Sequence, residues 1–331
     1  MTDPDLHSQT LERVVYLLRD RELSELERAK LALQHLEAQT HLSREDVLAA
    51  FGYSDARLKT PLLALHEFGR VMRGDLGQRV TLGYPSLDEA MRGMRPGQVG
   101  VIMARAGVGK TTLLLNVAAN IFEGETPHPI LFLSLEMAAA EVAARLFALS
   151  THQRPREVES WFSRSGEGPS ILAWMRKYQY FIICDRSALT LEQISKRITE
   201  AGEGTGLPVP LVMIDYLQLI GEGGSSAYER VSAIARGIKG LAKKHSCTIL
   251  AASQTSREGG TGGERVTLNM ARESGWIEEA ADFLIGCWRP ELAGNGGREE
   301  ELMACLLKNR HGPREDVSLR FDKTILRITE A

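Results

Sequence analysis

The amino-acid sequence predicts an α/β protein with a mostly parallel sheet flanked by helices, an antiparallel C-terminal extension and a small N-terminal helical region. From residue 98 onward, short apolar segments alternate with amphipathic helical segments, which is typical of a parallel sheet covered on both faces. The first strand continues through the glycine-rich stretch ARAGVGKTT into a helix, the context that a phosphate-binding loop requires. After residue 282, three strands are joined by short turns, which favours an antiparallel extension.

The N-terminal region has a helical pattern. Residues 9–39 carry apolar side chains at three-to-four spacing, and LSREDVLAAFGY repeats this pattern with Ser43 as the N-cap. A third helical stretch follows Pro61, and RGDLGQRV at 73–80 has the composition of a linker. We therefore expect a small helical region over residues 1–76 and the α/β domain over residues 77–331.

The remaining elements follow from the period of the apolar residues. Compact apolar runs predict strands, whereas apolar residues at three-to-four spacing predict helices, one of them with Thr190 as its N-cap. In chain order, we expect strand 98–104, helix 110–121, strand 129–136, helix 138–150, strand 180–185, helix 190–202, strand 210–220, helix 227–245, strand 247–253, and strands 282–288, 301–310 and 316–322.

Composition excludes some classes of protein. The net charge of -3 excludes a uniformly basic nucleic-acid binder, so any contact with DNA must come from a local patch or from a ring of several subunits. The chain has no basic N-terminal leader and no stretch approaching 18 apolar residues, so we expect no contact with a membrane. The four cysteines stand far apart within apolar runs, which indicates reduced core residues in a cytoplasmic protein.

The glycine-rich stretch predicts a site for ATP and Mg²⁺. The backbone N–H groups of residues 107–111 would point at the phosphates, the Lys110 ammonium would lie on the β- and γ-phosphates, and the Thr111 hydroxyl would bind Mg²⁺. The alternative is a glycine-containing helix start with an exposed lysine. Ala104 stands where such loops often begin with glycine, which is acceptable unless its φ is positive. The expected nucleotide-binding residues are Arg105, Ala106, Gly107, Val108, Gly109, Lys110, Thr111 and Thr112.

Three polar residues come at or near the ends of predicted strands. Asp215 follows four apolar residues, and a buried carboxylate needs a partner, either the Mg²⁺–nucleotide or a salt bridge. Glu136 would project toward the γ-phosphate, where a glutamate can orient and deprotonate the attacking water; alternatively, it belongs to the start of the next helix. Gln254 is suited to sensing the γ-phosphate, although a glutamine at a strand end is often plain surface.

Two cations near the C-terminus form another candidate. Lys308 and Arg310 are two residues apart, so on a strand their side chains point to the same face. The simpler alternative is that both side chains are exposed to solvent on an edge strand and have no further role. In a ring-forming ATPase, they would instead act as fingers, cations that one subunit supplies to the nucleotide of its neighbour.

Several motifs in fixed order make the sequence resemble the motor domain of DnaB-family replicative helicases. They are TLGYPSLDEAMRGMRPGQVGVIMARAGVGKTT, SLEM, MIDYLQLI, ASQTSR, RESGWIEEAAD, WRPE and KNRHGP, and the resemblance covers about residues 81 to 329. It implies a RecA-like P-loop NTPase core, with ATP hydrolysis coupled to DNA unwinding in a hexameric ring. It also implies that Glu136 is the catalytic base and that Lys308 and Arg310 serve the neighbouring subunit.

The resemblance further implies contacts with single-stranded DNA through ARESG. The residues there are Arg272, Glu273 and Gly275. The loop GEGGSSAYER that follows Asp215 is a second candidate. The alternative for Arg272 is a salt bridge to a glutamate of the following helix, Glu278 or Glu279.

The sequence also departs from the family. Ala106 stands where the family usually has proline, which loosens the loop. Residues 1–76 are too short for the family's collar domain and linker helix together, so we do not expect a contact with primase. We expect a docking helix within these residues, and a loader protein as a further partner.

Two other functions remain open at this point. One is a ring ATPase that acts as a recombinase, a loader or a clock-type assembly switch without unwinding DNA. The other is a non-catalytic ring that binds nucleotide only to oligomerise. The presence of Lys110, Glu136, Asp215 and Arg310 argues against the non-catalytic ring.

Overall fold

A computed structural model describes residues 79–124, 128–164, 169–224, 226–255, 262–268, 270, 275–293 and 300–331. All of them belong to one compact unit, Gly77–Ala331. The helical region expected over residues 1–76, with its docking helix, lies outside the described residues and stays a prediction.

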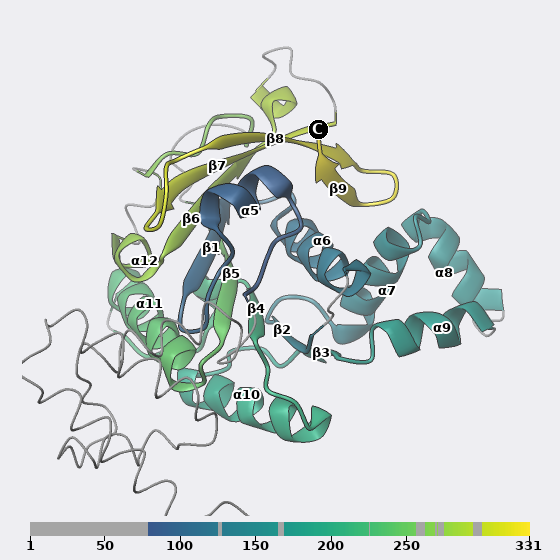
Figure 1. Cartoon of the computed structure of the whole chain (residues 1–331), viewed down its shortest axis with the longest axis horizontal. Coiled ribbons are helices and arrows are strands. Elements are labelled where there is room, and N and C mark those ends of the chain that lie inside the picture. Colours follow the sequence, from purple (N-terminus) through teal and green to yellow (C-terminus); the bar gives the residue numbers. More distant parts are fainter. Residues whose placement is uncertain are drawn as a thin grey trace, which may run out of the picture. The chain divides into compact units, whose positions relative to one another are not determined.

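The described residues contain one sheet of nine strands in the order β3-β2-β4-β5-β1-β6-β7-β8-β9 (Figure 1). The strands from β3 to β6 pair in parallel, whereas β7, β8 and β9 continue the sheet antiparallel. The bounds are β1 Val99–Ala104, β2 Ile130–Ser134, β3 Phe181–Cys184, β4 Leu211–Asp215, β5 Thr248–Gln254, β6 Phe283–Trp288, β7 Glu301–Asn309, β8 Asp316–Asp322 and β9 Arg327–Glu330.

Helices connect and cover the strands, and α8 and α9 project from the domain beyond α7 (Figure 1). The helix after β3 begins as predicted, because the Thr190 side chain accepts a hydrogen bond from the N–H of Gln193 and forms a capping box with it. The bounds are α5 Pro85–Met91, α6 Lys110–Glu123, α7 Ala139–Ser150, α8 Pro155–Arg164, α9 Pro169–Lys177, α10 Leu191–Thr205, α11 Ala227–Lys244 and α12 Gly275–Ala280, with 3-10 helices η1 Leu217–Leu219 and η3 Pro290–Ala293.

The predicted fold class is confirmed, including the antiparallel extension. The strand expected over 210–220 is shorter than predicted, because β4 ends at Asp215 and the apolar residues beyond it form η1. The sequence analysis did not predict α5, α8, α9 or β9, whereas α12 is the helix that it expected to carry Glu278 and Glu279. The unpredicted helix α8 is hydrophilic overall and buries only Val158, so few apolar residues mark it in the sequence.

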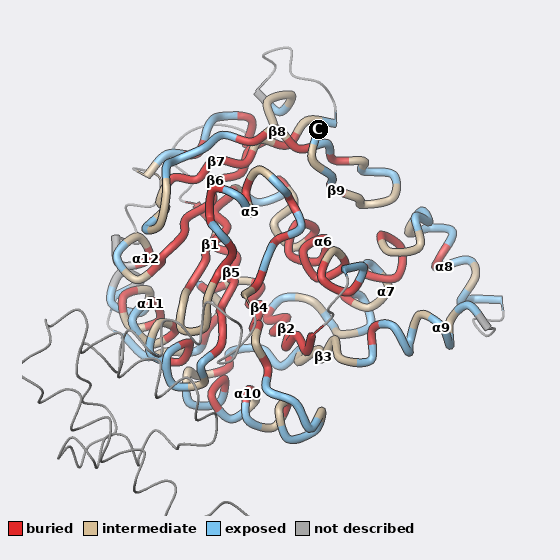
Figure 2. Tube along the Cα trace, viewed as in Figure 1, coloured by how far each residue is buried: buried red, intermediate tan, exposed pale blue. Residues whose placement is uncertain are grey.

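The core consists of two apolar layers, one on each face of the sheet. In β1, Ile102 and Ala104 pack with α5, α6 and α7, whereas Val101 and Met103 pack with α10 and α11 on the other face. Successive side chains of a strand point to opposite faces, so the central strands are buried throughout (Figure 2) and are apolar except at their last residues, Ser134 of β2 and Asp215 of β4. This continuous burial explains why they read as uninterrupted apolar runs.

The two edges of the parallel sheet carry different residues. We call the edge at which β1, β2, β4 and β5 end the carboxyl edge; it includes Ala104, Ser134, Asp215 and Gln254. The amino edge is where these strands begin. Because β7 runs antiparallel to β6 and Asn309 pairs with Phe283, the end of β7 lies at the amino edge.

All four cysteines are free thiols, and three of them are buried. None of the helices in the described ranges is long and apolar enough to cross a membrane.

Candidate functional site

The phosphate-binding loop occupies the turn between β1 and α6. Gly107 and Gly109 have φ values of 78° and 118°, which favour glycine because a Cβ atom is strained there. Gly109 is the N-cap of α6 and provides no side-chain cap, so the first N–H groups of this helix are open to an anion. Val108 is buried, while Ala106 and Gly107 are exposed. The loop therefore presents its backbone to solvent from a fixed position.

Lys110 folds back over this loop. Its Nζ donates to the carbonyl oxygens of Ala104 at 3.1 Å and Arg105 at 3.0 Å. Burial lowers the pKa of Lys110, and the negative charges of Asp215 and Glu136 oppose that shift. The lysine and both predicted carboxylates therefore share one electrostatic environment.

Asp215 lies at the carboxyl edge beside α6. The Thr111 hydroxyl donates to its Oδ2 at 2.7 Å, and the residue is only 2% exposed. Burial raises the pKa of Asp215; hydrogen bonding by Thr111 lowers it, and the charge of Glu136 raises it further. This carboxylate sits in surroundings that penalise its charge, so it would gain from a cation at this position.

These oxygens fit a hydrated Mg²⁺ ion. Mg²⁺ is commonly held by one or two protein oxygens together with substrate phosphates and water, and Thr111 and Asp215 provide two such atoms side by side. Within the ranges described above, there is no cluster of three His, Cys, Asp or Glu side chains that could hold a metal.

Glu136 and Gln254 come at the ends of β2 and β5, the two strands that flank β4 and its last residue Asp215. Glu136 is exposed just beyond β2, and the preceding Leu135 donates its N–H to the Asp215 carbonyl at 2.9 Å, which keeps this segment beside β4. Gln254 is the last residue of β5 and pairs with Ala104, where the phosphate loop begins. The predicted residues Lys110, Thr111, Glu136, Asp215 and Gln254 therefore share the carboxyl edge.

Gln218 also belongs to this site, although the sequence analysis did not predict it. Its amide Nε2 donates to Ser253 Oγ at 3.0 Å and to the Gln254 carbonyl at 2.9 Å, and its Oε1 accepts from the Gln254 N–H at 3.3 Å. This clasp fixes the end of β5 next to η1. A glutamine within the apolar run IDYLQLI was the available signal.

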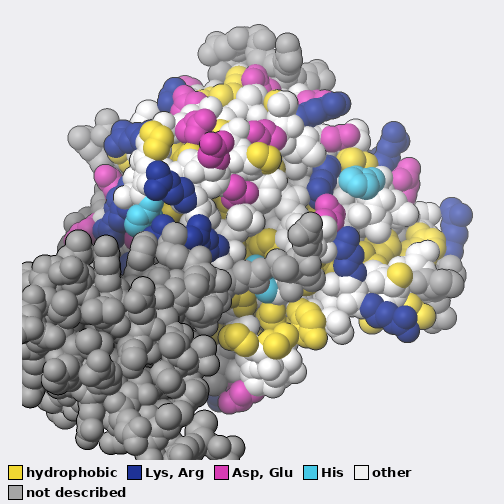
Figure 3. All heavy atoms as spheres, in the orientation of Figure 1, with side chains coloured by type: hydrophobic (Ala, Val, Ile, Leu, Met, Phe, Trp, Pro, Cys, Tyr) yellow, Lys and Arg dark blue, Asp and Glu magenta, His cyan; other side chains and the backbone are white. Residues whose placement is uncertain are grey.

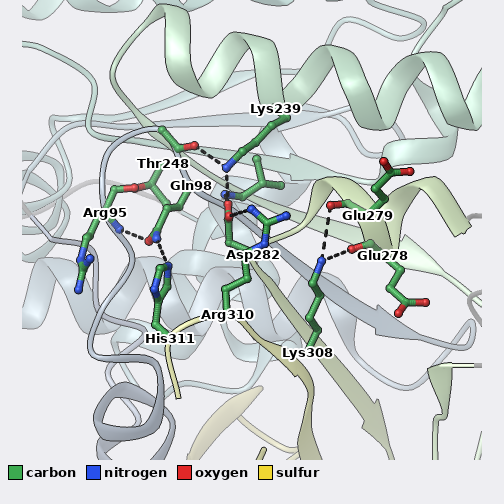
Figure 4. A network of polar contacts seen from close by, with 12 residues as sticks. Arg95, Gln98, Lys239, Thr248, Glu278, Glu279, Asp282, Lys308, Arg310 and His311 are labelled. Carbon is green, nitrogen blue, oxygen red and sulfur yellow. Dashed lines mark hydrogen bonds and ion pairs between the residues drawn. The ribbon is translucent and has the colours of Figure 1, made fainter. Parts of the chain in front are cut away.

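Lys308 and Arg310 lie at the amino edge instead (Figure 4). β7 ends at Asn309, so Arg310 stands just beyond the strand rather than on it. Lys308 Nζ donates to the backbone carbonyls of Glu278 at 2.5 Å and Glu279 at 3.5 Å, at the end of α12. Both glutamate side chains point away from the ammonium (Figure 4). Burial lowers the pKa of Lys308, as does the charge of Arg310.

Arg310 contacts Asp282, a buried residue that the sequence analysis did not single out. Its Nη1 lies 3.2 Å from Asp282 Oδ1, and Lys239 Nζ lies 2.5 Å from the other carboxylate oxygen, Oδ2. The Asp282 side chain is 5% exposed, against 48% for Arg310. An aspartate between a helix and the apolar strand FLIGCW was the signal in the sequence.

The predicted DNA contacts are largely untested by the structure. Arg272 and Glu273 lie outside the described residues, as does any salt bridge between Arg272 and Glu278 or Glu279. Gly275 is the first residue of α12.

The fold and this site define a RecA-like α/β domain with a phosphate-binding loop. Residues 79–330 match the family model for the DnaB-like helicase C terminal domain. The chain belongs to this family.

Known relatives agree with this assignment. The chain is 34% identical over 273 residues to "Replicative DNA helicase DnaB" of Mycoplasma genitalium, covering 76% of this chain and 56% of that protein. It is 28% identical over 256 residues to the protein of the same name from Haemophilus influenzae, covering 73% and 53%. The chain thus matches about half the length of these relatives.

Solved structures show the same fold. A structure described as an ATPase domain has a TM-score of 0.70 at 24% identity, covering 82% of this chain and 97% of that one. A structure of a DnaB-like replicative helicase, described together with its interactions with primase, has a TM-score of 0.67 at 21% identity and covers 99% of this chain and 76% of that one.

Proposed function

We propose that the protein is an ATP-driven DNA helicase of the DnaB type, which moves along single-stranded DNA as a ring of six subunits. Family membership over residues 79–330 supports this function, as do relatives named as replicative DNA helicases. The carboxyl-edge site provides the chemistry, and the amino edge provides the cations for a neighbouring subunit.

The phosphate loop would bind the nucleotide through its backbone. The open N–H groups at the start of α6 face the phosphates, and Lys110 exchanges its two carbonyl partners for β- and γ-phosphate oxygens. Thr111 and Asp215 would hold Mg²⁺, which supplies positive charge to the phosphates when bound. The burial of Asp215 favours the binding of Mg²⁺, because a bound cation would offset the cost of the buried negative charge.

Glu136 would act on the attacking water. It is exposed at the carboxyl edge, and its charge acts on both Lys110 and Asp215. A carboxylate in this position can orient water and accept its proton as the bond to the γ-phosphate forms. Gln254 would contact the γ-phosphate. Because Gln254 is hydrogen-bonded to Gln218, a shift of Gln254 on nucleotide binding would also move η1.

The separation of the two edges is the observation that carries the ring proposal. Lys308 and Arg310 lie at the amino edge, whereas the phosphate loop lies at the carboxyl edge, about 17 Å away along the five residue steps of β1. These cations therefore do not reach the nucleotide of their own chain. A head-to-tail neighbour would bring its amino edge to this carboxyl edge, and such contacts close into rings.

A ring also accommodates DNA binding by a chain of low net charge. Lys, Arg, Asp and Glu side chains are mixed over the face of α5, β8 and β9 (Figure 3). The proposed contacts, Arg272, Glu273 and Gly275, repeat in every subunit, so one cation per chain supplies several along the channel. Such binding would tolerate sequence changes and weaken with salt.

Strand displacement tests the function. The wild type should separate a forked duplex in an ATP-dependent manner, and Glu136→Gln should slow ATP hydrolysis by about two to four orders of magnitude while retaining Mg-ATP binding. Glu159→Gln, on the exposed surface of α8, is the matched control. ATP hydrolysis without any strand separation would instead indicate a ring that switches assembly.

A further inference from the structure

We propose that Asp282 is the positioning residue for the Arg310 finger, so that β1 links the nucleotide site of one subunit to the cation it presents to the next. This inference rests on the proposed function. Asp282 is a buried carboxylate that takes no direct part in the proposed nucleotide chemistry.

Asp282 is fixed to the amino end of β1 by both backbone and side chain. Its N–H donates to the Val99 carbonyl at 2.8 Å, and the Val99 N–H donates to Asp282 Oδ2 at 2.8 Å. Lys239 of α11 donates to the same oxygen at 2.5 Å. The backbone bond fixes the residue beside β1, and the two bonds to Oδ2 leave the carboxylate little freedom to rotate.

The other carboxylate oxygen faces Arg310. Oδ1 accepts from Arg310 Nη1 at 3.2 Å, and the Asp282 carbonyl accepts from the Arg310 N–H at 3.2 Å. The arginine is held at two points by one residue (Figure 4). A guanidinium has five N–H donors, and the side chain is 48% exposed. Arg310 can therefore keep its bond to Asp282 while it donates to an anion on another subunit.

A fixed carboxylate at position 282 would help the Arg310 side chain to reach the neighbouring subunit in the right orientation. An unrestrained arginine side chain loses about 2 kcal/mol of rotamer freedom when it is ordered, and small errors of placement cost large factors in rate. Asp282 orders the guanidinium before the neighbour arrives. Because Asp282 is bonded to Val99, the finger is set relative to β1, whose other end begins the phosphate loop at Ala104.

Replacing Asp282 by asparagine tests this assignment. Asp282→Asn keeps the shape but removes the charge that holds Arg310. We expect kcat of the assembled protein to fall about ten- to hundredfold, with the affinity of the chain's own site for ATP unchanged. Asp316→Asn, which breaks the Arg265–Asp316 pair on β8, is the matched control and should retain wild-type activity.

Mixing experiments separate positioning from a general loss of structure. Asp282→Asn has an intact phosphate loop and a misplaced Arg310. Lys110→Ala has a defective phosphate loop and a correctly placed Arg310. Mixed in equal amounts, they should regain activity at about one interface in four if chains assemble at random. A mixture of Asp282→Asn with Arg310→Ala should regain none, since both chains lack the same half of the interface.

The remaining outcomes are distinct. If Arg310→Ala mixed with Lys110→Ala recovers activity but Asp282→Asn with Lys110→Ala does not, the positioning role is wrong and the shared site stands. Full activity of Asp282→Asn alone, or weaker ATP binding in its own site, also overturns the positioning role. If neither mixture recovers, the shared site fails as well. Should Asp282→Asn not fold, Asp282→Asn/Lys239→Gln removes the unpaired lysine and enters the same mixtures.

Discussion

Lys110 is the side chain on which the proposed nucleotide site depends most directly. It contacts two carbonyls of its own loop, so Lys110→Ala removes a phosphate-neutralising charge without emptying the core. We expect ATP hydrolysis to fall by at least about a hundredfold, with little change in the unfolding temperature. Lys196→Ala, at an exposed position on α10, should hydrolyse ATP normally. Near wild-type hydrolysis by Lys110→Ala would refute the site.

The negative charge of Asp215, which we propose binds Mg²⁺, should lower the stability of the folded protein when no cation is bound. Its pKa is raised, mainly by burial, so the folded protein prefers the neutral carboxyl and loses stability as pH rises through this pKa. Asp215→Asn cannot ionise. Without nucleotide or Mg²⁺, we expect it to unfold at a higher temperature than the wild type at pH 7, with the difference vanishing below the ordinary pKa of aspartate, about 3.9. Thermal unfolding from pH 3.5 to 8 measures this.

Asp322 provides a control of opposite sign for this pH dependence. Hydrogen bonding by the Thr324 side chain lowers the pKa of Asp322. Its stabilising effect is therefore present above the ordinary pKa and lost as pH falls. Asp322→Asn should be destabilised at pH 7 but not in acid. If Asp215→Asn were destabilised at pH 7 in the same manner, the buried-charge argument would be wrong.

Both glycines of the turn between β1 and α6 have a positive φ, and one of them also lies close to a neighbouring side chain. At Gly109, φ is 118° and an added Cβ would lie 3.3 Å from Phe321 Cε1, whereas at Gly107 it would meet open space. Gly109→Ala should therefore cost about 1–3 kcal/mol of backbone strain, and it should weaken ATP binding more than Gly107→Ala does. Denaturant unfolding and nucleotide titration measure the two effects.

Gly204→Ala is the matched control for these substitutions. Gly204 lies within α10, and an added Cβ would have no atom within 4 Å. Alanine favours helix by about 1 kcal/mol over glycine, so this variant should be slightly more stable and bind ATP normally. Equal losses in all three variants would show that the loop conformation is not what matters.

Assembly should control activity if the site is shared between chains. A protomer has its phosphate loop at one edge and its finger cations at the other, so a complete site requires an interface. We expect ATP hydrolysis per chain to rise steeply with protein concentration through the range in which rings form. Sedimentation measured over the same concentrations gives the oligomeric state. A rate per chain that does not depend on concentration would exclude the shared site.

Most of the fold could be predicted from the sequence because its signals are local. Both faces of the central strands are covered, so they appear as apolar runs, and Thr190 with Gln193 marks a helix start by short-range hydrogen bonds. The phosphate loop was predictable for the same reason, since Gly107, Gly109 and Lys110 are close together in the chain. The helices α8 and α9 were missed because they bury few side chains.

The partners of the polar residues were decided only by tertiary structure. The sequence predicted one nucleotide site for Asp215, Glu136 and Gln254, whereas their actual neighbours, such as Gln218 beside Gln254, come from the pairing of the strands. Nothing local indicated that Asp282 would join Lys239, Val99 and Arg310, which are distant in sequence. Strand order decides those contacts, because β6 lies beside β1 and returns through β7 to the amino edge. The sequence by itself therefore determined the class of fold and the phosphate loop, while the direction and order of the strands placed Lys308 and Arg310 at the edge opposite that loop.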